Sequence, residues 1–562
     1  MINKRWTLND ANETHVAQLQ EQLGINKIFC ELLVHRGITN FDEAKAFFRM
    51  NEEQLHDPFL MKDMEKAINR IQEAMKKGEH ILFYGDYDVD GTTSVALVYS
   101  FFQHIYDRIG YYIPNRFSEG YGISEQGIEF AREHNFSLII TLDCGIKSID
   151  LIAKANEYGI DTIITDHHLP GNKLPDAHAI LNAKQSDCSY PYKELCGCGV
   201  GYKLIAAFGK KENIDREIIN EHLDLLATAI AADIVPITDE NRTLAFLGLQ
   251  KANENPCVPI TALKDVGELK RKLSIRDLVF IIGPRVNAAG RMTEASKAVK
   301  LFIEKDKHKA RNMAHELDAD NSERVQIDRS ITKQAIDMLE AESDKKSTVV
   351  YNKDWHKGVV GIVASRLIDK AYRPTIVLTE SNGMITGSAR SIKGFNMFEG
   401  LSACEDLLEN FGGHFFAAGL TLKEENLPAF KERFDKIVSE TLSPDQFIPE
   451  LNIDSKIELK QLNMRFLKTL EEFAPHGPEN LAPIFWASAV QNFEGRCSIV
   501  KDKHIRFVVK QENSPVINGI GFNLADKMNL ITDKESFDLA FHIERNVWRD
   551  RENIQLKVLD LK

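Results

Sequence analysis

Residues 80–102 read HILFYGDYDVDGTTSVALVYSFF, and this stretch decides the fold. It begins with a short apolar run, residues 81–84, which predicts a buried strand. An acidic turn follows, and then an apolar stretch that is typical of a buried helix. A strand that leads through a turn into a helix is the repeating unit of parallel α/β sheets.

Three further apolar runs continue this pattern, with helical patterns at residues 125–134 and 148–158 between them. The runs are SLIITLDCG (137–145), DTIITDHH (161–168) and AILNAK (179–184). The alternation predicts a doubly wound parallel sheet, in which ligands bind beyond the carboxyl ends of the strands. Three of the four runs end in Asp or His at that edge, where a core strand has no structural need for them.

The rest of the chain divides by pattern, and its 562 residues suggest about three or four domains. We predict a helical segment, the parallel-sheet domain, a long connecting helix, a second α/β domain and a small antiparallel barrel of OB type. Their boundaries are residues 1–75, 76–305, 306–345, 346–445 and 446–562.

Composition narrows the class of protein. Hydrophobic residues make up 43% and charged residues 27%, which is ordinary for a globular protein. No apolar run approaches the ~18 residues that cross a bilayer, and the first residues lack the apolar segment of a secretory signal. We therefore expect a cytoplasmic protein with reduced cysteines and no membrane contact. The net charge of −13 argues mildly against nucleic-acid binding but allows a local basic groove.

The acidic turn GDYDVDGTTS places Asp86, Asp88 and Asp90 at alternate positions directly after a strand. Carboxylates this close repel one another unless cations bind them. A calcium-binding EF-hand loop would need Glu at position 97, where Leu97 lies. A solvated acidic turn remains the alternative for this motif alone.

Further acids and histidines follow the later runs. Asp143 ends the second run, although an Asp there also caps helices. Asp166, His167 and His168 end the third run. If they converge on one sheet edge, they form a site of oxygen and nitrogen ligands, which suits Mg²⁺ or Mn²⁺.

One more acid lies in a helical stretch that we predict over residues 224–242. Asp233 interrupts its apolar sequence AADIVP, and a buried lone carboxylate is costly unless it is paired or bound to metal. The acids are numerous enough for two ions that share one carboxylate. Two such ions are the usual apparatus for attack on a phosphoester.

These motifs resemble those of a known superfamily. GDYDVDG, TLDCG, DHH and AADIVP, in this order, resemble the four motifs of the DHH phosphoesterases. Later motifs are similar to those of the RecJ family of single-strand-specific exonucleases: PNRFSEGYG (114–122), GPRVNAAGRM (283–292), WHKGVVGIVASRL (355–367), GSARS (387–391) and FGGHFFAAG (411–419). The resemblance extends from about residue 50 to the end; PHGPEN departs from it, because the family more often has Phe at the position of His476.

The resemblance implies a metal-dependent 5′→3′ exonuclease that hydrolyses single-stranded DNA to mononucleotides, in DNA repair and recombination. It implies two Mn²⁺ or Mg²⁺ ions, a DHH domain at residues 76–305 and a DHHA1-type domain at 346–445. A helicase or single-strand-binding protein is an expected partner, and the chain is expected to be a monomer. The alternatives are a DHH phosphodiesterase of short RNA or cyclic dinucleotides, and a non-catalytic DNA-binding DHH scaffold.

The resemblance also assigns roles to residues. The metal ligands are Asp88, Asp90, Asp143, His167 and Asp233, with Asp143 as the bridge and Asp86 as a further ligand or supporting acid. His168 completes the catalytic set by contacting the scissile phosphate, and Asp166 orients a histidine. Arg116, Ser388 and Arg390 hold the 5′ end of the strand. The remaining substrate-binding residues are Arg285, Arg291, His356, Arg366 and His414.

The predicted barrel and the cysteines indicate their function less clearly. The barrel has nearly equal numbers of basic and acidic residues, so it serves either a structural role or strand binding. Candidate strand contacts are Lys501, Lys503, His504, Arg506 and Phe507. Cys196 and Cys198 lack a second Cys-x-x-Cys pair, which argues against a zinc site there and for small residues in a tight segment.

Overall fold

The computed structural model describes residues 3–341, 344–549 and 551–562. The chain forms two compact units. Unit 1 comprises Met1–Ala44, Arg324–Glu472 and Pro483–Lys562, and unit 2 comprises Lys45–Glu323 and Phe473–Ala482. In the described part of the chain, no helix is both long and apolar enough to cross a membrane.

A five-stranded parallel sheet organises unit 2, in the order β3-β2-β4-β5-β6. The strands are β2 (His80–Gly85), β3 (Ile109–Tyr112), β4 (Phe136–Leu142), β5 (Asp161–Thr165) and β6 (Ala179–Leu181). The order reverses between β2 and β4, because the chain steps from β2 out to β3 and then returns across β2 to β4. Such a reversal opens a crevice at the carboxyl ends of the two strands.

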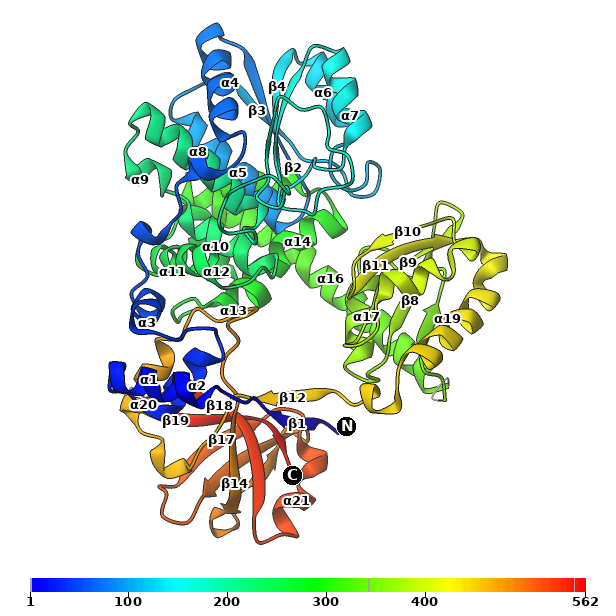
Figure 1. Cartoon of the computed structure of the whole chain (residues 1–562). Helices are drawn as coiled ribbons and strands as arrows, with labels where there is room; N and C mark the ends of the chain where they lie inside the picture. Colours follow the sequence, from blue (N-terminus) through cyan, green and yellow to red (C-terminus); the bar gives the residue numbers. More distant parts are fainter. Residues whose placement is uncertain (1–2, 342–343, 550) are drawn as a thin grey trace. The chain divides into compact units, whose positions relative to one another are not determined.

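Helices cover both faces of this sheet (Figure 1). The helices are α4 (Met64–Lys77), α5 (Val89–Gln103) and α8 (Gly197–Glu212) on one face, and α6 (Glu125–Glu133) and α7 (Ile149–Glu157) on the other. Alternate side chains of β2 serve the two cores: Ile81 and Phe83 face the first, Leu82 and Tyr84 the second. The doubly wound sheet is confirmed, and β3 is a strand that the sequence analysis did not predict.

The stretch predicted as one helix over residues 224–242 is two helices, which corrects the prediction. They are α10 (Leu223–Ala232) and α11 (Asp239–Glu254). Asp233 is the residue that ends α10, with its backbone N–H bonded to Ala229 O at 2.9 Å. Ile234 then adopts a φ of 60°, and Pro236 has no N–H to continue a helix. Asp233 therefore lies at a helix end rather than within a helix.

The long connecting helix is confirmed as α16 (Lys307–Ala341). The helices between α11 and α16 that matter below are α12 (Val258–Val266), α14 (Gly283–Met292) and α15 (Ser296–Phe302). A short π-helical segment, Leu278–Ile282, leads into α14.

Unit 1 contains a second five-stranded sheet, in the order β10-β11-β9-β8-β7. The strands are β7 (Thr348–Tyr351), β8 (Thr375–Ser381), β9 (Met384–Arg390), β10 (Asn410–Gly413) and β11 (Ala417–Leu422). One face of the sheet is covered by α17 (Val360–Ile368) and by the C-terminal part of α16. The other face is covered by α18 (Met397–Ser402) and α19 (Leu427–Thr441). Only β7 and β8 pair in parallel.

The C-terminal strands close into a barrel, as the OB-type prediction requires. β14 (Phe485–Asn492), β18 (Phe537–Trp548), β19 (Arg551–Leu561), β17 (Ile517–Gly521) and β16 (His504–Lys510) pair in this order, and β16 pairs again with β14. The β17–β19 pair is parallel, so the barrel is not purely antiparallel. Phe507 is fully buried inside it, which rules out the predicted base-stacking role for this side chain.

The first 75 residues are not one helical segment. β1 (Arg5–Leu8) pairs in parallel with β12 (Glu450–Ile453) of unit 1. α2 (Lys27–Val34) also packs there, with the Phe29 ring centroid 4.6 Å from that of Phe466. The rest of the segment, from Lys45, belongs to the Lys45–Glu323 part of unit 2.

Candidate active site and metal centre

Three of the predicted site acids directly follow the carboxyl ends of three neighbouring strands in unit 2. Asp86 follows β2, Asp143 follows β4, and Asp166 follows β5. Asp88 caps α5 by accepting from Gly91 N at 3.0 Å, and Asp90 lies in the first turn of that helix. The parallel register brings these strand ends to one edge, as the sequence predicted.

The ligand atoms form two neighbouring clusters. Asp86, Asp88 and Asp143 make one cluster, and Asp90, His167 and Asp233 make the other, with the atoms of each within 4.8 Å of one another. His167 Nε2 lies 3.2 Å from Asp143 Oδ1, 3.6 Å from Asp233 Oδ2 and 3.9 Å from Asp90 Oδ2. Asp143 thus contacts both clusters, and all six predicted metal ligands come together.

The first turn of α8 binds one acid of this site through backbone N–H groups. Gly197 N and Cys198 N donate to the two carboxylate oxygens of Asp90 at 2.6 and 2.8 Å. Backbone N–H groups at a helix start favour a negative charge, so they fix the Asp90 carboxylate in place. A Cβ added at Gly197 would lie 2.5 Å from Asp143 Cβ, so only glycine allows this approach.

We expect Gly197→Ala to damage the site without unfolding the protein. The added methyl must displace Asp143 or the start of α8, and either shift spoils the shared position between the two clusters. Mn²⁺ affinity, measured by isothermal titration calorimetry, should fall tenfold or more. Gly171→Ala is the matched control, because the nearest atom to a Cβ there lies 3.6 Å away. Unchanged Mn²⁺ affinity in Gly197→Ala would show that the close packing is not needed.

A chain of hydrogen bonds orients His168. Asp166 Oδ1 accepts from the backbone N of His167 at 2.7 Å and lies 2.7 Å from His168 Nδ1. Tyr121 OH lies 2.9 Å from His168 Nε2, at the outer end of the ring. Although burial alone would raise the pKa of Asp166, the hydrogen bond and charge of His168 lower it. Asp166 therefore stays ionised and fixes the imidazole, as the sequence analysis expected of it.

The acids of the two clusters are electrostatically crowded. Burial, followed by the charge of Asp88, raises the pKa of Asp86 to about 8 and that of Asp90 to about 7. Burial also raises the pKa of Asp143 and Asp233 well above the ordinary value. Carboxylates placed in this way hold protons until a cation replaces them.

The donor set fits divalent metal ions. Asp86 Oδ2, Asp143 Oδ1 and His167 Nε2 are buried and have no hydrogen-bond partner among the described residues. Burial lowers the pKa of His167 to about 3, so its Nε2 offers a neutral imidazole lone pair. Carboxylate oxygens with one imidazole suit Mn²⁺ and Mg²⁺. The backbone is strained beside them, with φ of 64° at Asp143 and 60° at the β-branched Ile234, as is common at functional sites.

The arginines predicted in unit 2 differ in their surroundings. The Arg116 guanidinium lies 5.1 Å from the ring centroid of Tyr87, the residue between Asp86 and Asp88. Burial raises the pKa of the Tyr87 hydroxyl, and the positive charges of Arg116 and Arg291 oppose that rise. Arg285 is instead engaged by α16, with Nε 2.9 Å from Asp318 Oδ1. Its guanidinium ties two helices together.

The substrate-binding residues predicted in unit 1 also differ. Ser388 and Arg390 lie on one face of β9, with Arg390 Nη1 donating to Ser388 Oγ at 3.0 Å. They lie against the first turn of α17, because a Cβ at Gly361 would be 2.9 Å from Arg390 Nη2. Arg366 is engaged elsewhere, in an ion pair of 2.7 Å with the buried Asp328.

The two predicted histidines of unit 1 lie in loops. His356 precedes α17 and accepts from Gly358 N at 3.1 Å through Nδ1. His414 is exposed in the turn between β10 and β11, with its backbone N–H bonded to Ala417 O at 2.8 Å.

Several contributors to the site could not be predicted from the sequence. Gly197 and Cys198 act through their backbone, and the CGCG sequence gave only the hint of a tight segment. Tyr121 lies within the quoted PNRFSEGYG motif, but its contact with His168 depends on the fold. Lys184 follows β6 and forms an ion pair of 3.1 Å with Glu194. Its positive charge contributes to the lowered pKa of His167 and opposes the raised pKa of Asp233.

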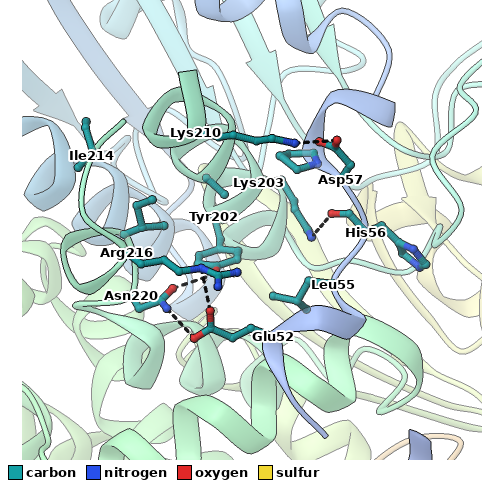
Figure 2. Close-up of a pocket in the computed structure, with 13 residues that line it drawn as sticks. Glu52, Leu55, His56, Asp57, Tyr202, Lys203, Lys210, Ile214, Arg216 and Asn220 are labelled. Carbon is teal, nitrogen blue, oxygen red and sulfur yellow. Dashed lines mark hydrogen bonds and ion pairs between the residues drawn. The ribbon is translucent and has the colours of Figure 1, made fainter. Parts of the chain in front are cut away.

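A separate cavity of about 580 Å³ in unit 2 is not part of this site (Figure 2). Its cationic side chains are already neutralised: Arg216 pairs with Glu52 at 3.0 Å, and Lys210 pairs with Asp57 at 2.8 Å. Lys203 pairs with the buried Glu240. The cavity therefore offers no free positive charge to an anionic ligand.

Comparisons with known proteins agree with this geometry. Family models match at residues 80–230 (DHH family, N-terminal domain), 344–440 (DHHA1 domain) and 453–560 (RecJ OB domain). The single-stranded-DNA-specific exonuclease RecJ of Bacillus subtilis is 37% identical, over 99% of this chain and 70% of its own length.

Two solved structures are also similar. RecJ of Thermus thermophilus in complex with Mn²⁺ has a TM-score of 0.86 at 24% identity, over 100% of this chain and 80% of that one. An exonuclease RecJ bound to manganese has a TM-score of 0.60 at 30% identity, over 69% of this chain and 96% of that one.

A parallel sheet with an acid cluster and a DHH sequence at its carboxyl edge defines a protein of the DHH class. Within that class, the match along almost the whole chain is specific. The chain belongs to the RecJ family.

Proposed function

We propose that this protein is a metal-dependent 5′→3′ exonuclease that hydrolyses single-stranded DNA to mononucleotides. The observation that carries the proposal is a pair of neighbouring ligand clusters, in which Asp143 of one lies 3.2 Å from His167 of the other. The similarity to proteins named single-stranded-DNA-specific exonucleases supports the substrate.

The acid cluster supplies the hydrolytic centre. The residues that would hold the ions are Asp88, Asp90, Asp143, His167 and Asp233. Asp143 would serve both ions, and Asp86 would complete the first cluster. When bound, two Mn²⁺ or Mg²⁺ ions would activate the attacking water and stabilise charge on the phosphate. The backbone N–H groups of Gly197 and Cys198 keep Asp90 in position throughout.

His168 is the proposed contact to the scissile phosphate. Burial opposes the charged form of His168, but the hydrogen bond and charge of Asp166 outweigh burial and raise the pKa of His168. The raised pKa shifts the ring toward the imidazolium form. An imidazolium is a charge-assisted donor to a phosphate oxygen. Tyr121 OH already lies 2.9 Å from His168 Nε2, so a phosphate oxygen would have to compete with Tyr121 for that ring nitrogen.

Ser388 and Arg390 are the proposed anchor for the 5′-terminal phosphate. Among the described residues, Arg390 bonds to Ser388 and to the carbonyl of Ala389, and no carboxylate neutralises it. The adjacent first turn of α17 adds backbone N–H groups, which favour anions. Arg116, Arg291, His356 and His414 are proposed as further strand contacts. Arg285 and Arg366 would have to leave their carboxylate partners to join them.

The predicted domain boundaries remain part of the proposal, as do the monomeric state and a helicase or single-strand-binding protein as partner. A repair and recombination nuclease of this kind would act in the cytoplasm, where chromosomal DNA is processed.

The experiment compares labelled single-stranded and double-stranded DNA, short RNA and cyclic dinucleotides as substrates, each with Mn²⁺ and with EDTA. The proposal predicts digestion of single-stranded DNA alone, and none in EDTA. Full activity in EDTA would overturn the metal assignment. Preference for short RNA or cyclic dinucleotides would make the protein a different DHH phosphodiesterase, and no activity at all would indicate a scaffold.

Binding of the strand should weaken as salt rises. Each phosphate held by Arg or Lys releases counterions, which gives a logarithmic slope of roughly 0.7 per contact for single strands. The affinity of a catalytically inactive variant for oligo(dT), measured by fluorescence anisotropy at several salt concentrations, reports this slope. A flat response would show that the proposed arginine contacts do not hold the strand.

A further inference from the structure

A second group of metal-ligating side chains lies in unit 2, outside the acid cluster. His222 is the residue before α10, Asp224 is in the first turn of α10, and Cys257 is the residue before α12. One ligand atom of each lies within 4.8 Å of the others. No motif in the sequence points to this group, because α11 separates Cys257 from the other two.

The His222 side chain is a buried polar group without a hydrogen bond in the described part of the structure. Both of its ring nitrogens are buried and lack a hydrogen-bond partner among the described residues, and its side chain is 12% exposed. A buried imidazole without a partner is costly, because its polar atoms have lost water and gained nothing. Its nearest acid, Glu221, lies 3.9 Å from Nε2 and is already hydrogen-bonded to His104 at 2.7 Å.

The backbone holds the other two groups in position. Asp224 Oδ2 accepts from Cys257 N at 2.7 Å, and Asp224 Oδ1 accepts from Leu225 N at 3.1 Å. These bonds orient the carboxylate while each oxygen keeps a lone pair free, as second-layer bonds do at metal centres. Cys257 is a free cysteine of intermediate exposure.

We propose that His222, Asp224 and Cys257 form a Zn²⁺ site, distinct from the Mn²⁺ or Mg²⁺ centre. One nitrogen, one oxygen and one sulfur ligand suit Zn²⁺, whereas the oxygen-rich acid cluster suits harder ions. Ligands at zinc bond lengths of about 2.0–2.3 Å lie closer together than the 4.8 Å that bounds the present separations, so the three side chains would draw together around the ion. Glu221 or water takes the fourth position, and the thiol proton of Cys257 leaves to solvent when the ion binds.

The position of this site gives it a role in the fold. α10 begins beside His222 and ends at Asp233, about 15 Å away for a helix of 10 residues. A Zn²⁺ ion would join the start of α10 to the start of α12. It would therefore fix the helix that carries one ligand of the acid cluster at its other end.

Cobalt(II) distinguishes the two centres, because only a thiolate ligand gives a near-ultraviolet sulfur-to-cobalt charge-transfer band. We expect titration of the full chain with Co²⁺ to produce this band and added Zn²⁺ to remove it. Cys257→Ser should abolish the band, and His222→Gln should weaken Co²⁺ binding at this site tenfold or more. Cys404→Ala, in unit 1, is the matched control and should leave the band unchanged.

Two results would overturn the proposal: a wild-type protein without the band, or a band that persists unchanged in Cys257→Ser. If Cys257→Ser does not fold, an unchanged band in His222→Gln overturns it equally. The band is independent of DNA hydrolysis, so this outcome does not depend on the proposed function.

Discussion

Asp143→Ala is expected to lower the rate of DNA hydrolysis by at least about a thousandfold, which corresponds to about 4 kcal/mol of transition-state stabilisation. Asp143 contacts both ligand clusters, so its loss removes a ligand from each proposed ion at once. Single-turnover digestion of a 5′-phosphorylated strand in saturating Mn²⁺ measures the effect. Calorimetry should show weaker Mn²⁺ binding in the same variant.

The fold should survive this substitution. Burial, followed by the charges of the neighbouring acids, raises the pKa of Asp143 well above its ordinary value, so removing this acid relieves repulsion in the cluster. Since Asp143 has a φ of 64°, Asp143→Asn is a useful companion, because asparagine tolerates this backbone and removes only the charge. Asp150→Ala, on the exposed first turn of α7, is the matched control. Turnover near that of the wild type in both Asp143 variants would refute the bridging role.

Arg390→Ala is expected to weaken binding of 5′-phosphorylated strands about tenfold or more. The variant loses a charge-assisted contact worth roughly 1.5–3 kcal/mol, and each 1.4 kcal/mol is a factor of ten in affinity. Strands with a 5′-hydroxyl already lack part of this contact and should lose less. Mn²⁺ binding should not change, because Arg390 is not a metal ligand.

The two strands and two proteins form a double-mutant cycle, which isolates the coupling between Arg390 and the 5′ phosphate. Arg433→Ala is the matched control in unit 1, since Arg433 forms an exposed ion pair with Asp406. If Arg390→Ala weakens both strands equally, the coupling is zero. Arg390 would then be a general backbone contact rather than the reader of the 5′ end.

The sequence predicted the acid cluster well because strand periodicity and strand ends are local signals. Asp86, Asp143 and Asp166 each follow an apolar run, and parallel strands must place such residues at one edge. Asp233 was predicted as a site residue but wrongly placed within a helix. The left-handed turn at Ile234 leaves no clear mark in a sequence read as apolar and helical.

Other contributors depend on tertiary packing and could not be predicted in this way. Gly197 and Cys198 bind Asp90 through backbone N–H groups, which every non-proline residue has. Phe507 was predicted as a candidate strand contact, but the alternation of β16 places it inside the barrel. His222 and Cys257 meet only because α10 and α12 begin side by side.

Digestion of single strands that carry a label at either end tests the central claim most directly. With Mn²⁺, a 5′-label should be released at once as a mononucleotide, whereas a 3′-labelled strand should shorten one nucleotide at a time. This pattern requires hydrolysis at the first phosphodiester bond from the 5′ end, repeated along the strand. Early release of a 3′-label, or internal fragments from either strand, would contradict the 5′→3′ exonuclease proposed for this chain.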